Sequence, residues 1–199
     1  DMDGIEFCKR IKNDERTSHI PFILLTARKS IESELEGLES GADDYITKPF
    51  NNSVLLTKIK NTLKLRQELR ERFMGDLNII PEGIKLTNRD EVFLKRIIDI
   101  VESDISNTEF DKEEFYKNIG MSRTQVYRKL NALTNQSVNE FIRNIRLKKA
   151  AEILKFSKNI SIAELAYTTG FSNPNYFTRV FREHFGLTPT QYNSKHCQT

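Results

Sequence analysis

The chain contains one motif twice within residues 111–193, and this internal repeat restricts its possible folds more than any other feature. The first copy reads DKEEFYKNIGMSRTQVYRKLNALTNQSVNEF, and the second reads SIAELAYTTGFSNPNYFTRVFREHFGLTPTQY. Gly120 in the first copy corresponds to Gly170 in the second, and after one extra residue Arg128 corresponds to Arg179. A repeat of this length indicates one supersecondary unit that is used twice.

Each copy carries the signals of two short helices joined by a turn. Asp111 and Ser161 are each followed three residues later by glutamate, which predicts a capping box at the start of the first helix. Gly120 and Gly170 suit the left-handed conformation that ends such a helix. We expect the second helices at residues 122–133 and 173–185. Two helices joined in this way form a helix-turn-helix, whose second helix can enter the DNA major groove.

The N-terminal part has a different pattern, in which helices alternate with strands. The apolar run Pro21–Thr26 predicts a strand of a parallel sheet that is buried on both faces, and Asp44–Thr47 predicts the next strand. Helices are expected from Asp3, from Ser30 to about Ser40, and from Asn51 or Asn52 to about Arg72. We therefore predict a mainly α chain with a partial α/β region at residues 1–73, a linker at 74–88, and an all-α region at 89–199 with helix-turn-helix units at 111–134 and 161–185.

The charge of the chain is divided between these regions. Residues 115–199 carry 13 Lys and Arg against 4 Asp and Glu, whereas the preceding residues carry 18 against 24. A basic region of this kind favours a polyanionic partner. The two cysteines lie far apart, and with the three histidines they show no metal-ligand spacing, so we expect free thiols and no metal site. We see no signal peptide and no apolar run near twenty residues, which favours a cytoplasmic chain.

Three N-terminal segments carry a family resemblance. The segments DMDG, PFILLTA and GADDYITKPF resemble the second half of a flavodoxin-like response-regulator receiver domain. The resemblance implies that Thr26 contacts a phosphoryl group, that Lys48 pairs with it, and that Tyr45 changes rotamer on activation, although Tyr45 could also be an ordinary strand residue. It further implies a cis bond between Lys48 and Pro49.

The same resemblance implies that part of the receiver lies outside this chain. The family's phosphoacceptor aspartate and its metal-binding acidic pair come before the MDG segment, so we expect no phosphoacceptor here. We interpret the chain as a fragment of a longer protein or as a degenerate receiver. Mg²⁺ is expected only in a complete receiver, and we expect no other cofactor.

The repeat itself resembles the DNA-binding domain of the arabinose-regulator (AraC/XylS) family over residues 89–193. The segment from Ile160 to Tyr192 carries the strongest match. The resemblance implies base-reading roles for Thr124, Gln125, Arg128, Asn175, Thr178 and Arg179. Arginine can read guanine and glutamine can read adenine, although these arginines could instead pair with a neighbouring acid. Pro174 also occupies a reading position but has no donor to offer.

A long apolar-patterned helix is expected between the two units, at residues 138–156. Its nineteen residues would span about 28 Å, close to the ~34 Å between successive major grooves on one side of DNA. Basic side chains on and around the units are candidates for phosphate contacts, with plain solvation as the alternative. These candidates are Arg123, Lys129, Arg143, Arg146, Lys148, Lys149 and Arg182.

The joined pattern resembles the C-terminal end of hybrid two-component regulators. This implies a sequence-specific transcription regulator at the output end of a phosphorelay. Its expected partners are double-stranded DNA, an upstream kinase or phosphodonor, and a second copy of the chain. The alternative is a phosphosignalling interaction module with a vestigial DNA-binding domain. We find no nucleophile–base pair and no phosphate-binding glycine loop, so we do not expect an enzyme, although a histidine kinase and a membrane anchor could lie upstream.

Overall fold

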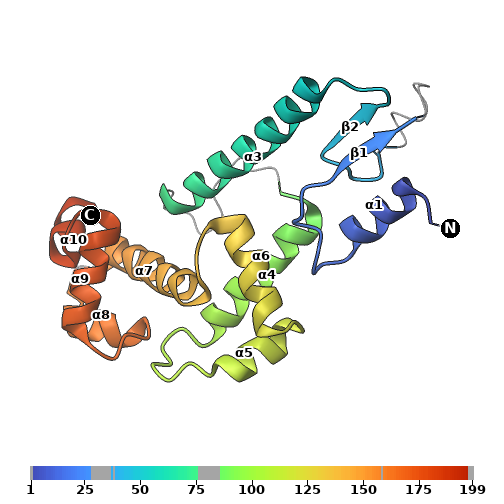
Figure 1. The fold of residues 1–199 in the computed structure, drawn as a ribbon. Helices are drawn as coiled ribbons and strands as arrows, with labels where there is room; N and C mark the ends of the chain where they lie inside the picture. The colour runs from blue at the N-terminus through green and yellow to red at the C-terminus, as the bar shows by residue number, and fades with distance from the viewer. Residues whose placement is uncertain (1, 28–36, 38, 76–85, 158, 197–199) are drawn as a thin grey trace. The chain divides into compact units, whose positions relative to one another are not determined.

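The computed structural model describes residues 2–27, 37, 39–75, 86–157 and 159–196 (Figure 1). Within these residues helices predominate, and the strands form one two-stranded sheet. The chain divides into two compact units. The first unit takes residues 1–76, 81–94 and 123–135, and the second takes 77–80, 95–122 and 136–199. The predicted fold class, a partial α/β receiver followed by a helical tandem domain, is confirmed.

The first unit contains a short parallel sheet flanked by helices. Its first elements are α1 (Gly4–Asn13), β1 (Ile23–Thr26), β2 (Asp44–Thr47) and α3 (Asn52–Gly75). The strands pair from Ile23 with Asp44 to Thr26 with Thr47. The α1 and α3 helices lie on either side of the sheet (Figure 1), and Lys58 of α3 pairs with Asp44 of β2 at 2.5 Å. Both strands lie where the apolar runs placed them.

The burial of β1 differs from the prediction. Leu24 is only 6% exposed, but the neighbouring Leu25 is 39% exposed, so β1 is not buried on both faces. A parallel pair of two strands buries a side chain only on the face that another element covers. The helix predicted from Ser30 lies mostly outside the described residues, although Gly41 has the positive φ expected at its end.

Two further helices contribute to the first unit. They are the N-terminal half of α4 (Asn88–Ser103) and the whole of α6 (Arg123–Thr134). Thr87 caps α4, because its hydroxyl accepts a hydrogen bond from the Asp90 amide at 3.2 Å. In α6, Val126 and Leu130 are fully buried, as their helical spacing predicts. Arg70 of α3 donates to the carbonyl of Ala132 in α6 at 2.9 Å.

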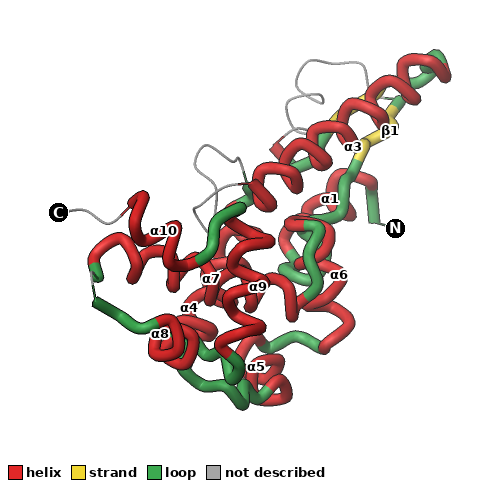
Figure 2. Tube along the Cα trace, turned by 90° about the vertical axis from the view of Figure 1, so that its left-hand side faces the viewer, coloured by secondary structure: helices red, strands yellow, loops and turns green. Residues whose placement is uncertain are grey.

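The second unit is built from helices alone among its described residues (Figure 2). Besides the C-terminal half of α4, its helices are α5 (Lys112–Ile119), α7 (Val138–Phe156), α8 (Ile162–Thr168), α9 (Pro174–Phe185) and α10 (Pro189–His196). The α7 helix spans the predicted nineteen residues. Leu147, Leu154, Leu165, Phe177 and Phe181 are at the centre of the core that α7 to α10 share.

The helix boundaries follow the local signals in the sequence. Asp111 and Ser161 each accept hydrogen bonds from backbone amides in the first turn of the following helix. Ser137 and Glu140 form a complete capping box at the start of α7. Positive φ occurs at Gly120 and Gly170, as predicted, and also at Asn135 and Gly186, which follow α6 and α9. Such signals act over three or four residues, so they are readable without the tertiary structure.

Three further observations concern membrane spans, metal ligands and cysteines among the described residues. No helix within the described ranges is both long and apolar enough to cross a membrane. In that part of the chain, no group of three or more His, Cys, Asp or Glu side chains could hold a metal ion. Cys8 is a buried free thiol, and Cys197 lies outside the described residues.

Candidate nucleic-acid interface

The second recognition helix, α9, is held by caps and by an aromatic core. The Asn173 side chain accepts from the amides of Asn175 and Tyr176 at 2.9 and 3.0 Å, and Pro174 occupies the first turn. Phe177 and Phe181 are fully buried, with ring centroids 5.6 Å apart. This packing fixes which face of α9 points inward and leaves the opposite face to solvent.

The exposed face of α9 carries the predicted reading residues. Asn175 and Arg179 are exposed, while Thr178 is partly buried and donates its hydroxyl to the carbonyl of Pro174 at 2.9 Å. The Arg179 guanidinium lies 5.4 Å from the centre of the Tyr176 ring. This cation–π contact restricts the arginine side chain without using its donors, which remain free to bind a base edge.

The first recognition helix, α6, presents a similar set. Thr124 and Arg128 are exposed, and Gln125 is partly buried. Val126 and Leu130 on the other face are fully buried. Arg128 therefore has the same relation to the buried face of α6 as Arg179 has to that of α9.

Arg146 has a structural role that its sequence pattern did not reveal. Its guanidinium donates to the carbonyl of Gly170 at 2.8 Å and to the carbonyl of Asn107 at 2.6 Å. Burial lowers the pKa of this arginine. Gly170 lies at the turn between α8 and α9 with φ of 79°, and a Cβ atom there would meet the carbonyl oxygen of Ile105 at 2.2 Å. Arg146 thus clamps this turn, which sets where α9 begins.

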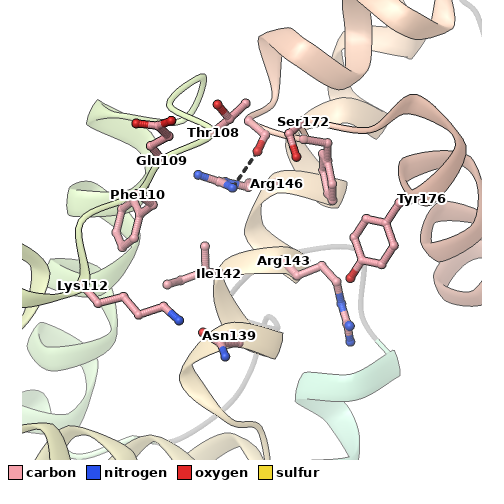
Figure 3. A pocket seen from close by; sticks show the side chains of 12 residues that line it. Thr108, Glu109, Phe110, Lys112, Asn139, Ile142, Arg143, Arg146, Ser172 and Tyr176 are labelled. Atoms are coloured by element: carbon pink, nitrogen blue, oxygen red, sulfur yellow. Dashed lines mark hydrogen bonds between the residues drawn. The ribbon is translucent and has the colours of Figure 1, made fainter.

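A cleft of about 380 Å³ opens beside this clamp (Figure 3). Lys112 and Arg143 reach it from α5 and α7, and Tyr176 faces it from α9. Glu109 is the carboxylate among its lining residues. Two cations and a phenol at the mouth of one cleft suit a phosphate group, because each can donate a hydrogen bond to phosphate oxygens. Lys112 could not be recognised from the sequence, because a lysine in the first turn of a helix shows no pattern of its own.

The other predicted phosphate-contact residues differ in accessibility. Arg123 and Arg182 are exposed, and Lys149 is partly buried and pairs with Glu152 at 3.2 Å. Lys148 is only 5% exposed and Lys129 is fully buried. The predicted phosphate contact is wrong for Lys129, whose ammonium pairs with Asp90 at 2.9 Å. The burial of Lys148 likewise removes it from the surface where a phosphate would bind.

The three predicted receiver residues, Thr26, Tyr45 and Lys48, lie in the two strands or directly after them. Thr26 ends β1, and Lys48 directly follows β2, with the Lys48 amide donating to the Thr26 carbonyl at 2.6 Å. The Lys48 side chain is exposed, and the Lys48–Pro49 bond is cis, as the resemblance implied. Tyr45 is 7% exposed and lies opposite Leu24 in the sheet. The roles of these three side chains in switching stay a prediction.

Comparison with known proteins assigns both regions. Residues 1–60 match the response regulator receiver domain, and residues 116–195 match a helix-turn-helix domain. The chain is 43% identical over 198 residues to a Formosa agariphila protein named Histidine kinase P4. The match covers 100% of this chain and 14% of the length of that relative. It is also 49% identical over 61 residues to the phosphate regulon transcriptional regulatory protein PhoB of Pseudomonas aeruginosa. This match covers 31% of this chain and 27% of that relative.

A solved structure shares the fold of the helical part. It is a transcriptional regulator from Chromobacterium violaceum with an AraC-type DNA-binding domain. The match has a TM-score of 0.51 at 21% identity, and it covers 56% of this chain and 98% of the other. The chain therefore joins a segment that matches a receiver domain to a segment that matches a helix-turn-helix domain, and its helical part shares the fold of that regulator.

Proposed function

We propose that this chain, in which a receiver segment precedes an AraC-type helix-turn-helix domain, reads specific DNA sequences with two recognition helices. The observation that supports this most is the match between α6 and α9. Each helix buries its apolar face and exposes an arginine at the equivalent position, Arg128 or Arg179. An exposed arginine on a helix of this kind can bind guanine through two hydrogen bonds. Thr124, Gln125, Asn175 and Thr178 are the further candidates for base contacts.

The length of α7 supports a bipartite reader. This helix follows α6 in the chain and precedes α8 and α9. Its nineteen residues correspond to about 28 Å, a length suited to recognition helices in successive major grooves about 34 Å apart. One polypeptide would then bind two adjacent sites that most helix-turn-helix proteins bind as dimers.

The cleft beside Gly170 supports a contact to the DNA backbone in the same complex. We assign a phosphate to the space bordered by Lys112, Arg143 and Tyr176. Arg123, Lys149 and Arg182 are further candidates on the surface. Arg146 contributes indirectly, because it positions the turn from which α9 starts.

Control by a phosphorelay is the second part of the proposal. The match to a receiver domain and the similarity to a protein named Histidine kinase P4 favour a kinase as the source of phosphate. Because this chain spans 14% of that relative, the kinase would belong to the parent polypeptide, and the chain itself would act by binding DNA.

The test begins with selection of a preferred sequence from random DNA duplexes by the full chain. Arg179→Ala and Arg128→Ala should each cost about 1–3 kcal/mol on the selected sequence and should relax the preference at one base position. Arg182→Ala is the matched control on α9. It should weaken binding to all sequences equally. It should also reduce the salt slope, which is the slope of the logarithm of the binding constant against the logarithm of salt concentration, by about 0.9, because it removes one phosphate contact.

Two outcomes would contradict the proposal. If no sequence is enriched while the chain still binds DNA, the helix-turn-helix units are vestigial readers. If a sequence is enriched but both arginine variants retain full affinity and preference for it, base reading has been assigned to the wrong residues. The affinities should be compared at several salt concentrations, because the phosphate contribution depends on salt.

A further inference from the structure

Lys129 on the first recognition helix is fully buried, although its side chain is charged. The repeat supplies a direct comparison, because Arg128 corresponds to Arg179 and Lys129 therefore corresponds to Val180. Val180 is 4% exposed in the apolar core of the second unit. The same helix position is thus buried in both copies, but only the first copy places an ammonium group there.

The Lys129 ammonium has three oxygen partners from three parts of the chain. It donates to the carbonyl of Glu15 at 2.6 Å and to the hydroxyl of Ser18 at 2.9 Å, and it pairs with Asp90 at 2.9 Å. The Ser18 hydroxyl in turn donates to Asp90 at 2.8 Å. Three partners match the three donors of an ammonium group, so the buried charge is fully satisfied.

The carboxylate of Asp90 in this cluster stays charged at neutral pH. Burial raises the pKa of Asp90, but the hydrogen bond and positive charge of Lys129 outweigh this effect and leave the pKa below its usual value. A buried ion pair adds little to stability compared with an apolar pair of the same shape. Val180 shows that an apolar residue suits this position of the repeat, so stability alone does not explain the lysine. The three oxygen partners of its ammonium group, from Glu15, Ser18 and Asp90, explain why a lysine occupies this position.

The partners of Lys129 connect the recognition helix to the receiver segment. Glu15 and Ser18 lie between α1 and β1, within the residues that match the receiver domain. Asp90 belongs to α4, which begins the helical region. The contact is made on the buried side of α6, while Thr124 and Arg128 remain exposed. The receiver segment therefore holds α6 without covering its reading residues.

We propose that Lys129 is a docking residue, through which the α1–β1 segment of the receiver fixes the position of the first recognition helix. Its consequence for DNA rests on the proposed function, because only a reading helix would transmit its position to base contacts. The docking itself does not depend on DNA. A change in the receiver that moves Ser18 would alter the support of α6 directly, in addition to any effect through the covalent connector.

Hydrogen exchange in the full chain tests the docking without DNA. Ser18→Ala removes a hydroxyl that bonds to both Lys129 and Asp90, and backbone amides in α6 should then exchange about tenfold faster, the effect of about one lost net hydrogen bond. Thr17→Ala is the matched control. It removes a hydroxyl from the same segment that bonds to the carbonyl of Ile11 instead, and exchange in α6 should not change.

A double-mutant cycle tests whether Ser18 acts through Lys129. Lys129→Val introduces the residue of the second copy, and Ser18→Ala added to it should produce no further change in α6 exchange if the two residues form one contact. Multiplicative effects of the two substitutions would overturn the proposal. So would equal acceleration of α6 exchange by Thr17→Ala and Ser18→Ala.

Salt-dependent DNA binding separates docking from a phosphate contact. With the sequence selected by the wild-type chain, Lys129→Val and Ser18→Ala should both lower specific affinity while the salt slope stays unchanged. A slope reduced by about 0.9 in Lys129→Val would mean that the lysine contacts phosphate, which would overturn the proposal. If no sequence is selected, the proposed function fails, but the exchange measurements still decide whether Lys129 docks the receiver segment.

Discussion

The two recognition helices share a sequence pattern but are supported in different ways. The α9 helix lies in the second unit and packs through aromatic rings, such as Phe177 and Phe181, on a core that belongs to the same domain. The α6 helix lies in the first unit, where its buried lysine bonds to Ser18 and Asp90. The core contacts of α9 come from the helical region, whereas the contacts of Lys129 in α6 include Glu15 and Ser18 of the receiver segment.

The difference shows how a duplicated motif can acquire two roles. Both copies keep the cap, the glycine at the turn and the exposed arginine, which the proposed reading of DNA would require. At the buried position of Lys129 and Val180, the first copy has a charged side chain and the second an apolar one. Hydrophobic contacts are non-directional, whereas an ammonium group selects partners with the correct geometry. The substitutions below test this comparison, beginning with the largest expected effect.

Placing a lysine in the second copy should be the most damaging change. Val180→Lys would bury an ammonium group within a cluster of apolar side chains, and we expect a loss of about 4–5 kcal/mol in the stability of the second unit. Urea unfolding followed by circular dichroism measures this loss. Arg179→Lys is the control, because it places a lysine on the exposed face and should change stability by less than about 0.5 kcal/mol. Equal stability of Val180→Lys and wild type would show that the position is not buried.

The two turn glycines should respond unequally to alanine. Gly170 has a φ of 79°, and its added Cβ would meet the Ile105 carbonyl at 2.2 Å. Gly120 has a φ of 75°, but no atom lies within 4 Å of the added Cβ. We expect Gly120→Ala to cost about 1–2 kcal/mol through backbone strain alone, and Gly170→Ala to cost about 4 kcal/mol because overpacking is added. Denaturant midpoints should reveal the order, and equal costs would contradict the close approach.

The stability of the first unit should depend on pH through His19. Burial lowers the pKa of His19 to about 4 from the usual 6.5, so the unfolded chain binds a proton first as the pH falls. The contribution of neutral His19 to the free energy of unfolding is fully present above pH 6.5. It decreases as the pH falls toward 4, by about 3 kcal/mol in total. His19→Gln should remove this dependence.

The matched residue in the second unit is His184, whose pKa burial also lowers to about 4. It should contribute a loss of stability in the same pH window. Unfolding measured between pH 7 and pH 4 on wild type, His19→Gln and His184→Gln separates the two contributions. An unchanged pH dependence in His19→Gln would show that this imidazole is not buried in its neutral form.

Giving the first copy the residue of the second should have a moderate effect on stability. Lys129→Val leaves Asp90 buried without its cation, although the Ser18 hydroxyl still donates a hydrogen bond to its carboxylate. We expect a loss of about 2–3 kcal/mol, and the added substitution Asp90→Leu should recover most of it. Calorimetry of the single and double variants tests this. No recovery in the double variant would indicate that the cluster has a packing role that apolar residues cannot replace.

The sequence alone determined the features that depend on neighbouring residues. The order of the helices, the bounds of α7, the caps at Asp111 and Ser161, and the positive φ at Gly120 and Gly170 follow from signals among neighbouring residues. The repeat and the family resemblances also identified the receiver segment, the helix-turn-helix domain and the exposed arginines of α6 and α9.

The tertiary structure decided the roles of the basic side chains. The pattern grouped Lys129, Arg146 and Lys148 as phosphate contacts, but Lys129 binds residues more than a hundred positions away and Arg146 bonds to the carbonyls of Asn107 and Gly170. A positive charge in a sequence marks what a side chain could attract, whereas burial and partners decide what it binds. These depend on residues that only the fold brings together, and for this reason the contrast between α6 and α9 could not be predicted from the repeat.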